Sequence, residues 1–194
     1  MKEVKTEFAV LKEENEELRT KNITLTSKVE KLNDKVRNLE QYSRKNNVEI
    51  SGLPVTPKEN VFELVRDVGS ALGMEIDEKD ISAAHRVPSF SKDRHQPLIV
   101  QFVSRLTRDS MIGKFRDKKK MIAHEVNASF PKDSMYVNEH LSPDNKVFLK
   151  SLKNKCKEIG YEYAWCRDGK FFVRKCQDAK CKKIDNYDEL LKLQ

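Results

Sequence analysis

The sequence lacks an apolar run long enough to span a membrane, and its first residues lack the apolar core of a signal peptide. We therefore expect an intracellular protein, cytoplasmic or nuclear, with no membrane partner. Cysteine is sparse, at four residues, and no two cysteines form a close CxxC pair. In a reducing compartment these cysteines are expected to be free thiols, and their spacing does not predict a structural metal site.

Motifs of catalysis are missing as well. The chain has no glycine-rich phosphate-binding loop, no nucleophile elbow and no helix with metal-spaced histidine and glutamate, and its four histidines are scattered. The sequence thus predicts no catalytic residue, no metal or cofactor site and no small-molecule substrate. We expect a protein that is not an enzyme.

Charge, in contrast, is abundant. Charged residues make up 36% of the chain, the net charge is +7, and residues 85–120 contain 10 basic and 3 acidic side chains. Concentrated positive charge favours a polyanionic partner, and nucleic acid is the first candidate.

An unbroken heptad repeat runs through residues 4–39. Leucine recurs at the d positions and valine or asparagine at most a positions, a combination that favours two parallel strands. In a parallel pair the flanking charges attract one another, as for Glu7 with Lys12 and Glu14 with Arg19. Residues 1–43 are therefore predicted to form a parallel coiled coil between copies of this chain, and the pattern favours a dimer. The predicted oligomerisation residues are Leu11, Asn15, Leu18, Asn22, Leu25, Val29, Leu32, Val36 and Leu39.

Residues 44–139 are predicted to form a split βαβ sandwich, the fold of RNA-recognition domains, so that the whole chain belongs to the α+β class. Hydrophobic periodicity, capping residues and turn residues together give the element order β-α-β-β-α-β. Strands are expected at 48–50, 81–87, 97–103 and 135–138, and helices at 61–72 and 105–119.

The open sheet face of this predicted domain lacks stacking aromatics. Glu49 stands where an RNA-recognition domain presents a stacking aromatic, and Ile99 and Gln101 are expected to face outward on the third strand. Nucleic acid is therefore expected on the basic loops and on the second helix, where Arg105 and Arg108 are predicted to point outward.

Residues 140–194 are predicted to form a small domain of one helix and a hairpin. The helix begins at Ser142, with a proline in its first turn, and is expected to run to Ile159. A basic stripe follows its exposed face, and a nucleic-acid contact and an ordinary solvated face are both open interpretations. The candidate binding residues of the stripe are Lys150, Lys153 and Lys157. A final short helix is expected at 184–193, with inward Leu190, Leu191 and Leu193.

The hairpin is predicted to turn at Asp168–Gly169. This register places four large side chains on one face of the hairpin. We favour packing of this aromatic face against the preceding helix. The alternative is an exposed face on which Trp165, Arg174 and Lys175 contact an unstacked base. The four side chains are Tyr163, Trp165, Phe172 and Arg174.

Five separated stretches of the chain carry a resemblance to known proteins. They are EQYSRKNNVEISGLP (40–54), ISAAHRV (81–87), PLIVQFVSRLTRD (97–109), YVNEHLSPDNK (136–146) and GYEYAWCRDGKFFVRK (160–175). They are similar to arthropod proteins related to the baculovirus few-polyhedra (FP) protein. The order of coiled coil (1–43), RNA-recognition-like domain (44–139) and FP-type C-terminal domain (140–194) also resembles the first-open-reading-frame protein of LINE-type retrotransposons.

The resemblance implies a homo-oligomeric protein that binds single-stranded RNA or DNA largely without sequence preference, in a retrotransposon-type packaging or chaperone role. Because the LINE-type rod is trimeric, it implies a trimer as the alternative to the dimer. The family's basic binding residues carry over to Arg44 and Lys45 at the coil junction and to Arg86, Lys92 and Arg94 before the third strand. The viral relatives imply an alternative function, a structural scaffold that acts in virion or occlusion-body assembly through protein contacts.

Overall fold

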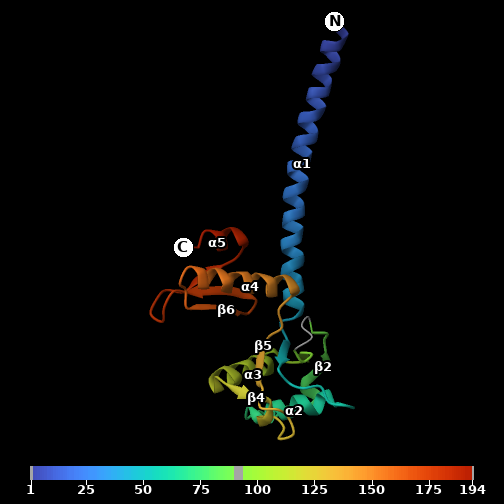
Figure 1. Ribbon diagram of the computed structural model, residues 1–194. Coiled ribbons are helices and arrows are strands. Elements are labelled where there is room, and N and C mark those ends of the chain that lie inside the picture. The colour runs from blue at the N-terminus through green and yellow to red at the C-terminus, as the bar shows by residue number, and fades with distance from the viewer. Residues whose placement is uncertain (1, 90–93, 194) are drawn as a thin grey trace. The chain divides into compact units, whose positions relative to one another are not determined.

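The predicted heptad region is one uninterrupted helix, α1 (Lys2–Ser43), in the computed structural model of the protein (Figure 1). The structure describes residues 2–89 and 94–193. The apolar residues at the a and d positions, which we call the seam, are exposed over more than half of their surface, from 53% for Val29 to 70% for Phe8. The predicted helix is therefore confirmed. Its seam forms no core within the first of the two compact units into which the chain divides, Met1–Glu40 and Gln41–Gln194.

The second unit begins with a five-stranded antiparallel sheet in the order β2-β3-β1-β5-β4. Two helices and two short 3-10 turns, Glu78–Asp80 and Ala123–Glu125, connect the strands. The element order is the predicted one with β4 added. The strands are β1 (Asn47–Ser51), β2 (Ile81–Arg86), β3 (Leu98–Phe102), β4 (Met121–Ile122) and β5 (Ser134–Glu139), and the helices are α2 (Val61–Ala71) and α3 (Arg105–Lys118).

Alternation along the strands builds the first hydrophobic core. Val48 and Ile50 of β1 are fully buried together with Val65 and Val68 of α2 and Met111 of α3. Since successive strand residues point to opposite faces, one face of the sheet packs against both helices. The helix starts follow from their caps: the Asn60 side chain accepts hydrogen bonds from two backbone N–H groups of α2, and Ser104 caps α3.

The opposite sheet face is not an open platform. Ile99 lies on this face, as predicted, yet it is only 1% exposed. Glu49 beside it pairs with Lys146 at 2.6 Å. The central strands therefore present a covered isoleucine and a paired carboxylate, neither of which offers an aromatic surface to a base.

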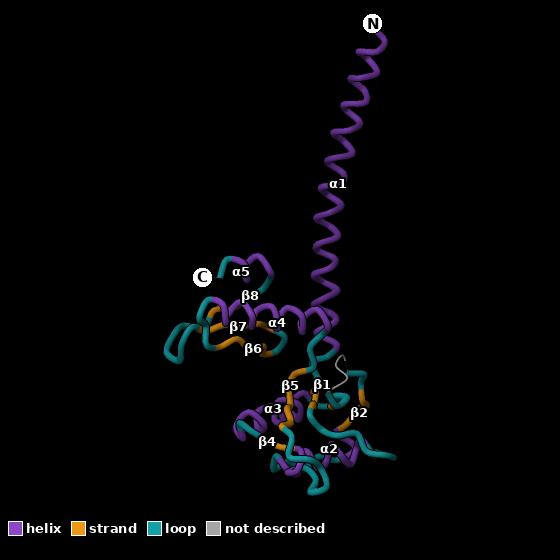
Figure 2. Tube along the Cα trace, in the orientation of Figure 1, coloured by secondary structure: helices purple, strands orange, loops and turns teal. Residues whose placement is uncertain are grey.

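Residues 143–193 form a second core around the helix α4. Phe148, Leu152 and Cys156 of α4 pack against Phe171 and Val173 of the hairpin. Strands β6 and β7 lie alongside α4 (Figure 2), and the three-stranded order is β6-β7-β8. The elements are α4 (Pro143–Glu158), β6 (Tyr163–Arg167), β7 (Lys170–Arg174), β8 (Lys182–Ile184) and α5 (Tyr187–Leu191).

Two predicted side-chain orientations are wrong. Arg108 was expected to point outward from α3, but it is 4% exposed. It lies three and four residues before the buried Met111 and Ile112, on the same face of the helix. Leu191 was expected to face inward, but it is 71% exposed because the short helix α5 turns only Leu190 into the core.

Within residues 2–89 and 94–193, no helix is both long enough and apolar enough to cross a membrane.

Candidate nucleic-acid interface

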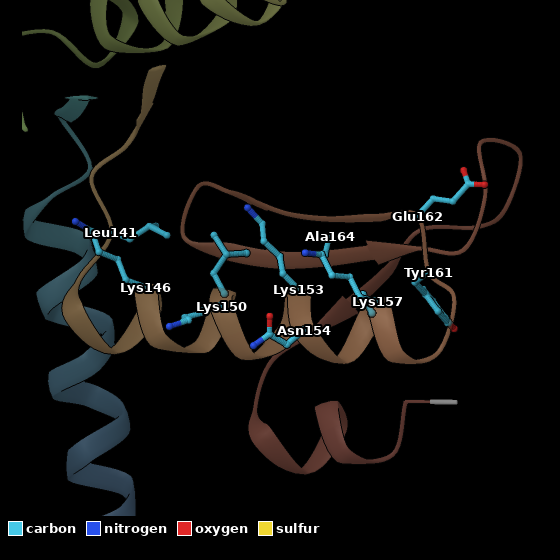
Figure 3. A pocket seen from close by; sticks show the side chains of 11 residues that line it. Leu141, Lys146, Lys150, Lys153, Asn154, Lys157, Tyr161, Glu162 and Ala164 are labelled. Carbon is cyan, nitrogen blue, oxygen red and sulfur yellow. The ribbon is translucent and has the colours of Figure 1, made fainter. Parts of the chain in front are cut away.

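A row of lysines on α4 lines a shallow groove of about 520 Å³, which we call the lysine groove. Lys146, Lys150, Lys153 and Lys157 follow one another at intervals of three or four residues, so they share one side of the helix (Figure 3). Figure 3 also shows the acidic residue of this groove, Glu162, beyond the end of the row. The groove therefore presents positive charge along the helix.

Three of these lysines are available to a ligand. Lys146 is committed to Glu49, as described above. Lys150, Lys153 and Lys157 are exposed, and within the described part of the chain no acidic side chain forms an ion pair with them. An exposed lysine without an ion-pair partner in the fold can pair with a phosphate group.

The hairpin turns its aromatic face away from α4, so the packing that we favoured from the sequence is wrong. The register itself is the predicted one, with Tyr163 opposite Arg174 and Trp165 opposite Phe172. The face that packs on α4 is the other one, where Phe171 meets Phe148 edge to face at 4.7 Å. That face carries no polar side chain, whereas the aromatic face would bury a guanidinium, an indole N–H and a phenol hydroxyl.

The aromatic face is ordered by ring contacts. The rings of Trp165 and Phe172 stack with their centres 5.8 Å apart and their planes at 22°. The guanidinium carbon of Arg174 lies 4.6 Å from the centre of the Tyr163 ring. Both contacts cross from β6 to β7. They hold a large flat surface and a positive charge side by side.

This face forms one wall of a second groove of about 970 Å³, the aromatic groove. Phe115, Arg116 and Lys119, from α3 and the residue after it, also line this groove. Five basic and two acidic side chains line it in all, and it shares Lys153 and Leu149 with the lysine groove. The two grooves are thus continuous. Neither Arg116 nor Lys119 was among our predicted binding residues, although both belong to the basic stretch 85–120.

A cluster of charges fixes the hairpin turn. The Glu139 carboxylate accepts hydrogen bonds from the backbone N–H groups of Asp168 at 2.8 Å and Gly169 at 3.1 Å. Arg108 lies 3.5 Å from the same carboxylate, and Arg105 donates to the Asp168 carboxylate at 2.7 Å. The two arginines of α3 that were predicted to bind nucleic acid, Arg105 and Arg108, are therefore engaged in holding the turn.

Gln41 fastens the start of α4. Its Oε1 accepts from the backbone N–H of Ser142 at 3.0 Å and from Asn145 Nδ2 at 2.8 Å, and its Nε2 donates to the His140 carbonyl at 3.1 Å. His140 is half-buried, and burial together with nearby Lys146 lowers its pKa to about 4. Four of the stretches that carried the family resemblance thus meet through these contacts and those of Glu139.

Arg86 is also engaged within the fold. Its side chain donates five hydrogen bonds: two to the Glu59 carboxylate and three to the carbonyls of Leu53, Pro54 and Gln96. A guanidinium has five N–H donors, so none is left for a phosphate. The structure therefore does not support Arg86 as a binding residue, and we exclude it and Arg108 from the candidate interface.

The remaining predicted residues lie outside the two grooves or near their edge. Lys45 Nζ lies 4.6 Å from the centre of the Tyr42 ring. Arg94 and Lys175 are exposed, and Arg44 lies in the turn after α1. Lys92 lies outside the described residues. The structure thus brings together Lys150, Lys153, Lys157, Trp165 and Arg174.

Cys166, which lines the aromatic groove, is not a reactive thiol. All four cysteines are free, and burial together with the nearby Glu139 raises the pKa of Cys166 to about 12. A thiol with so high a pKa stays protonated and is a poor nucleophile. In the described part of the chain, no group of three or more potential metal ligands is placed to hold an ion.

Comparison with known proteins gives a match to a family model. A search of curated proteins found no relative of this chain. The family model that matches is Baculovirus FP protein domain 2, over residues 142–194. That range begins at the N-cap of α4. It contains the hairpin, α5 and all four lysines of the row on α4. The part of the chain that builds the lysine groove and the aromatic face is therefore similar to domain 2 of baculovirus FP proteins.

Proposed function

We propose that this chain is a homo-oligomeric protein that binds single-stranded nucleic acid, RNA or DNA, with little sequence preference. The observation that carries the proposal is the aromatic face of the hairpin, which turns away from its own core and lines a groove with five basic side chains. Aromatic rings stack on any unpaired base, and basic side chains bind any phosphate, so this combination suits a single strand of any sequence.

The strand would follow the two continuous grooves. Lys150, Lys153 and Lys157 would contact phosphates, and Trp165 would stack on an unpaired base with Arg174 beside it. A duplex keeps its bases paired and stacked, and would lose the contact with Trp165. We therefore expect a preference for single strands.

Self-association through α1 would multiply this binding. The exposed seam of α1 is the kind of surface that a second copy covers in a coiled coil, and we propose a parallel dimer with a trimer as the alternative. Linked binding modules gain avidity on the order of 10²–10⁴-fold when one strand can reach them all.

The element order and strand order of residues 44–139 support an RNA-recognition-like domain. In our proposal this domain positions the C-terminal grooves and does not stack bases on its sheet. A relation to LINE-type retrotransposon proteins, with their packaging or chaperone role, is part of the same proposal. We propose no catalytic activity.

The experiment is fluorescence anisotropy of a labelled single-stranded RNA with the full chain at several salt concentrations. Replacing Lys150, Lys153 and Lys157 together by alanine should lower the affinity about 100-fold at 0.1 M salt, because each lost phosphate contact reduces the salt slope by about 0.7. The matched control replaces the exposed Lys170, Lys180 and Lys182, which line neither groove. An equal loss in both triple variants would contradict the assignment of the grooves.

A structural scaffold is the second candidate function. The match to a viral protein domain and the exposed Val147 and Leu191 on the helices of the C-terminal core favour a protein contact there. A full chain that binds no single-stranded RNA or DNA even at low salt would favour this scaffold over the nucleic-acid binder.

A further inference from the structure

Lys119 is held in a strained backbone conformation immediately after α3. Its φ of 62° and ψ of −40° put it in a region that side-chain-bearing residues rarely adopt. The backbone N–H of Lys120 donates to the Lys118 carbonyl at 2.7 Å, which closes a γ-turn around Lys119. A γ-turn with positive φ at its centre is rare and strained, and glycine is the residue that adopts positive φ without that cost.

The neighbouring lysines are used by the fold. Lys118 Nζ donates to the Ala71 carbonyl at 3.1 Å and pairs with Glu125 at 2.6 Å. Lys114, one turn earlier, donates to the Gly73 carbonyl at 2.6 Å. Both side chains thus bind backbone carbonyls at the end of α2.

Lys119 is placed differently. It is exposed and lines the aromatic groove together with Arg116 and Arg174. Within the described part of the chain no acidic side chain forms an ion pair with it. Of the run Lys118–Lys120, it alone lines this groove.

We propose that Lys119 is a further ligand-contacting residue of the aromatic groove, which binds a phosphate of the strand whose base lies on the hairpin. The inference rests on the proposed function. A lysine in a position that favours glycine lowers stability, and the γ-turn sets the direction in which the side chain leaves the backbone. In this inference, the protein gains a positive charge in the groove at the expense of some folding stability.

The test compares variants of the full chain in which binding and stability move separately. Lys119→Gly and Lys119→Ala both remove the ammonium, but only Lys119→Gly relieves the strained φ. Lys119→Arg keeps the charge. Lys120→Ala is the matched control, since Lys120 is the next residue, is exposed and does not line the groove.

Anisotropy with a labelled oligouridylate should show about fivefold weaker binding at 0.1 M salt for both Lys119→Gly and Lys119→Ala, with a salt slope lower by about 0.7. Lys119→Arg and Lys120→Ala should stay within about twofold of the wild type. In thermal unfolding, the Tm of Lys119→Gly should exceed that of Lys119→Ala by roughly 2–4 °C.

Two results would overturn the inference while the proposed function stands. The first is wild-type affinity and salt slope in Lys119→Gly. The second is an equal Tm for the glycine and alanine variants, which would show that the backbone is not strained there. A wild-type chain that does not bind the oligouridylate would instead overturn the proposed function and this inference together.

Discussion

The two halves of the second unit use their basic side chains in opposite ways. In the sheet domain, two of the arginines predicted to bind nucleic acid are turned inward: Arg86 donates all five of its N–H groups to Glu59 and backbone carbonyls, and Arg108 lies against Glu139. In the C-terminal core, Lys150, Lys153 and Lys157 are exposed along a groove. A planar guanidinium can satisfy several fixed acceptors at once, whereas an ammonium on a flexible stem stays in water. The density of basic residues in a sequence therefore does not locate a binding surface.

The largest predicted effect comes from preventing self-association, because each molecule then brings only one exposed groove to a strand. Leu25→Asp places a charge in the seam of α1 and should prevent self-association, so that affinity for a long single strand falls by about 10²-fold or more. The matched control is Ile23→Asp, because Ile23 is 72% exposed but lies outside the a and d positions. Sedimentation gives the mass of each variant, and anisotropy gives its affinity.

The two variants should differ in both measurements. If Leu25→Asp is monomeric yet binds like the wild type, the grooves act singly and avidity has no part in binding. If Ile23→Asp also becomes monomeric, the contact between copies is not the predicted heptad seam.

The second prediction concerns the inward arginines. Arg86→Ala leaves Glu59 and three carbonyls without their donor, and breaking such a buried pair costs about 3–5 kcal/mol. We expect a lower Tm by several degrees, with unchanged RNA affinity for the folded fraction. Arg94→Ala is the control, since Arg94 is exposed and should leave the Tm unchanged. Weaker RNA binding by folded Arg86→Ala would return Arg86 to the interface.

Local signals in the sequence predicted most helices and strands, but they did not predict which groups every side chain contacts. The caps at Asn60 and Ser142 and the turn at Asp168–Gly169 gave the helices and the hairpin register, because each depends on residues close together in the chain. The short strands β4 and β8 were not predicted, since two or three residues carry no periodicity.

Long-range contacts explain what could not be predicted. Which hairpin face packs on α4 depends on Phe148, since both faces carry aromatic residues. The engagement of Arg86 depends on Glu59 and distant carbonyls that no local pattern connects. The burial of Arg108 is different, because its spacing to Met111 and Ile112 gave a helical-face signal that its charge concealed.

The third prediction sharpens the role of the hairpin turn in positioning the grooves. Gly160 and Gly169 both have positive φ, at 75° and 70°, so alanine at either position adds backbone strain of about 1 kcal/mol. A Cβ at Gly169 would also meet Gln41 Cγ at 2.7 Å, whereas one at Gly160 meets nothing within 4 Å. Because three hydrogen bonds hold the Gln41 side chain, it cannot move aside freely.

We therefore expect Gly169→Ala to lose about 1 kcal/mol more than Gly160→Ala in chemical denaturation. In the background of Gln41→Ala, the two alanine variants should cost the same. Equal costs in the wild-type background would mean that Gln41 does not pack against the turn.

The last predicted effect is a pH dependence that comes from His140. Burial, with Lys146, Arg44 and His85 nearby, lowers its pKa to about 4, from 6.5 in a model compound. The unfolded chain therefore binds a proton at His140 as the pH falls through about 6.5, while the folded chain stays neutral there until about pH 4. Stability from this residue is full above pH 6.5 and is lost on the way down to pH 4, by about 1–2 kcal/mol after allowance for solvent screening of a half-buried group.

Replacing the imidazole should remove this part of the pH dependence. In thermal unfolding at pH 7 and pH 5, His140→Gln should show a smaller decrease in Tm than the wild type, whereas His95→Gln, at an exposed position, should behave like the wild type. The His140 carbonyl accepts from Gln41 Nε2, and its Nδ1 accepts from Asn47 Nδ2 at 3.2 Å, so protonation of the ring adds positive charge where the start of α4 is fastened. A Tm decrease in His140→Gln as large as in the wild type would show that the acid sensitivity does not come from His140.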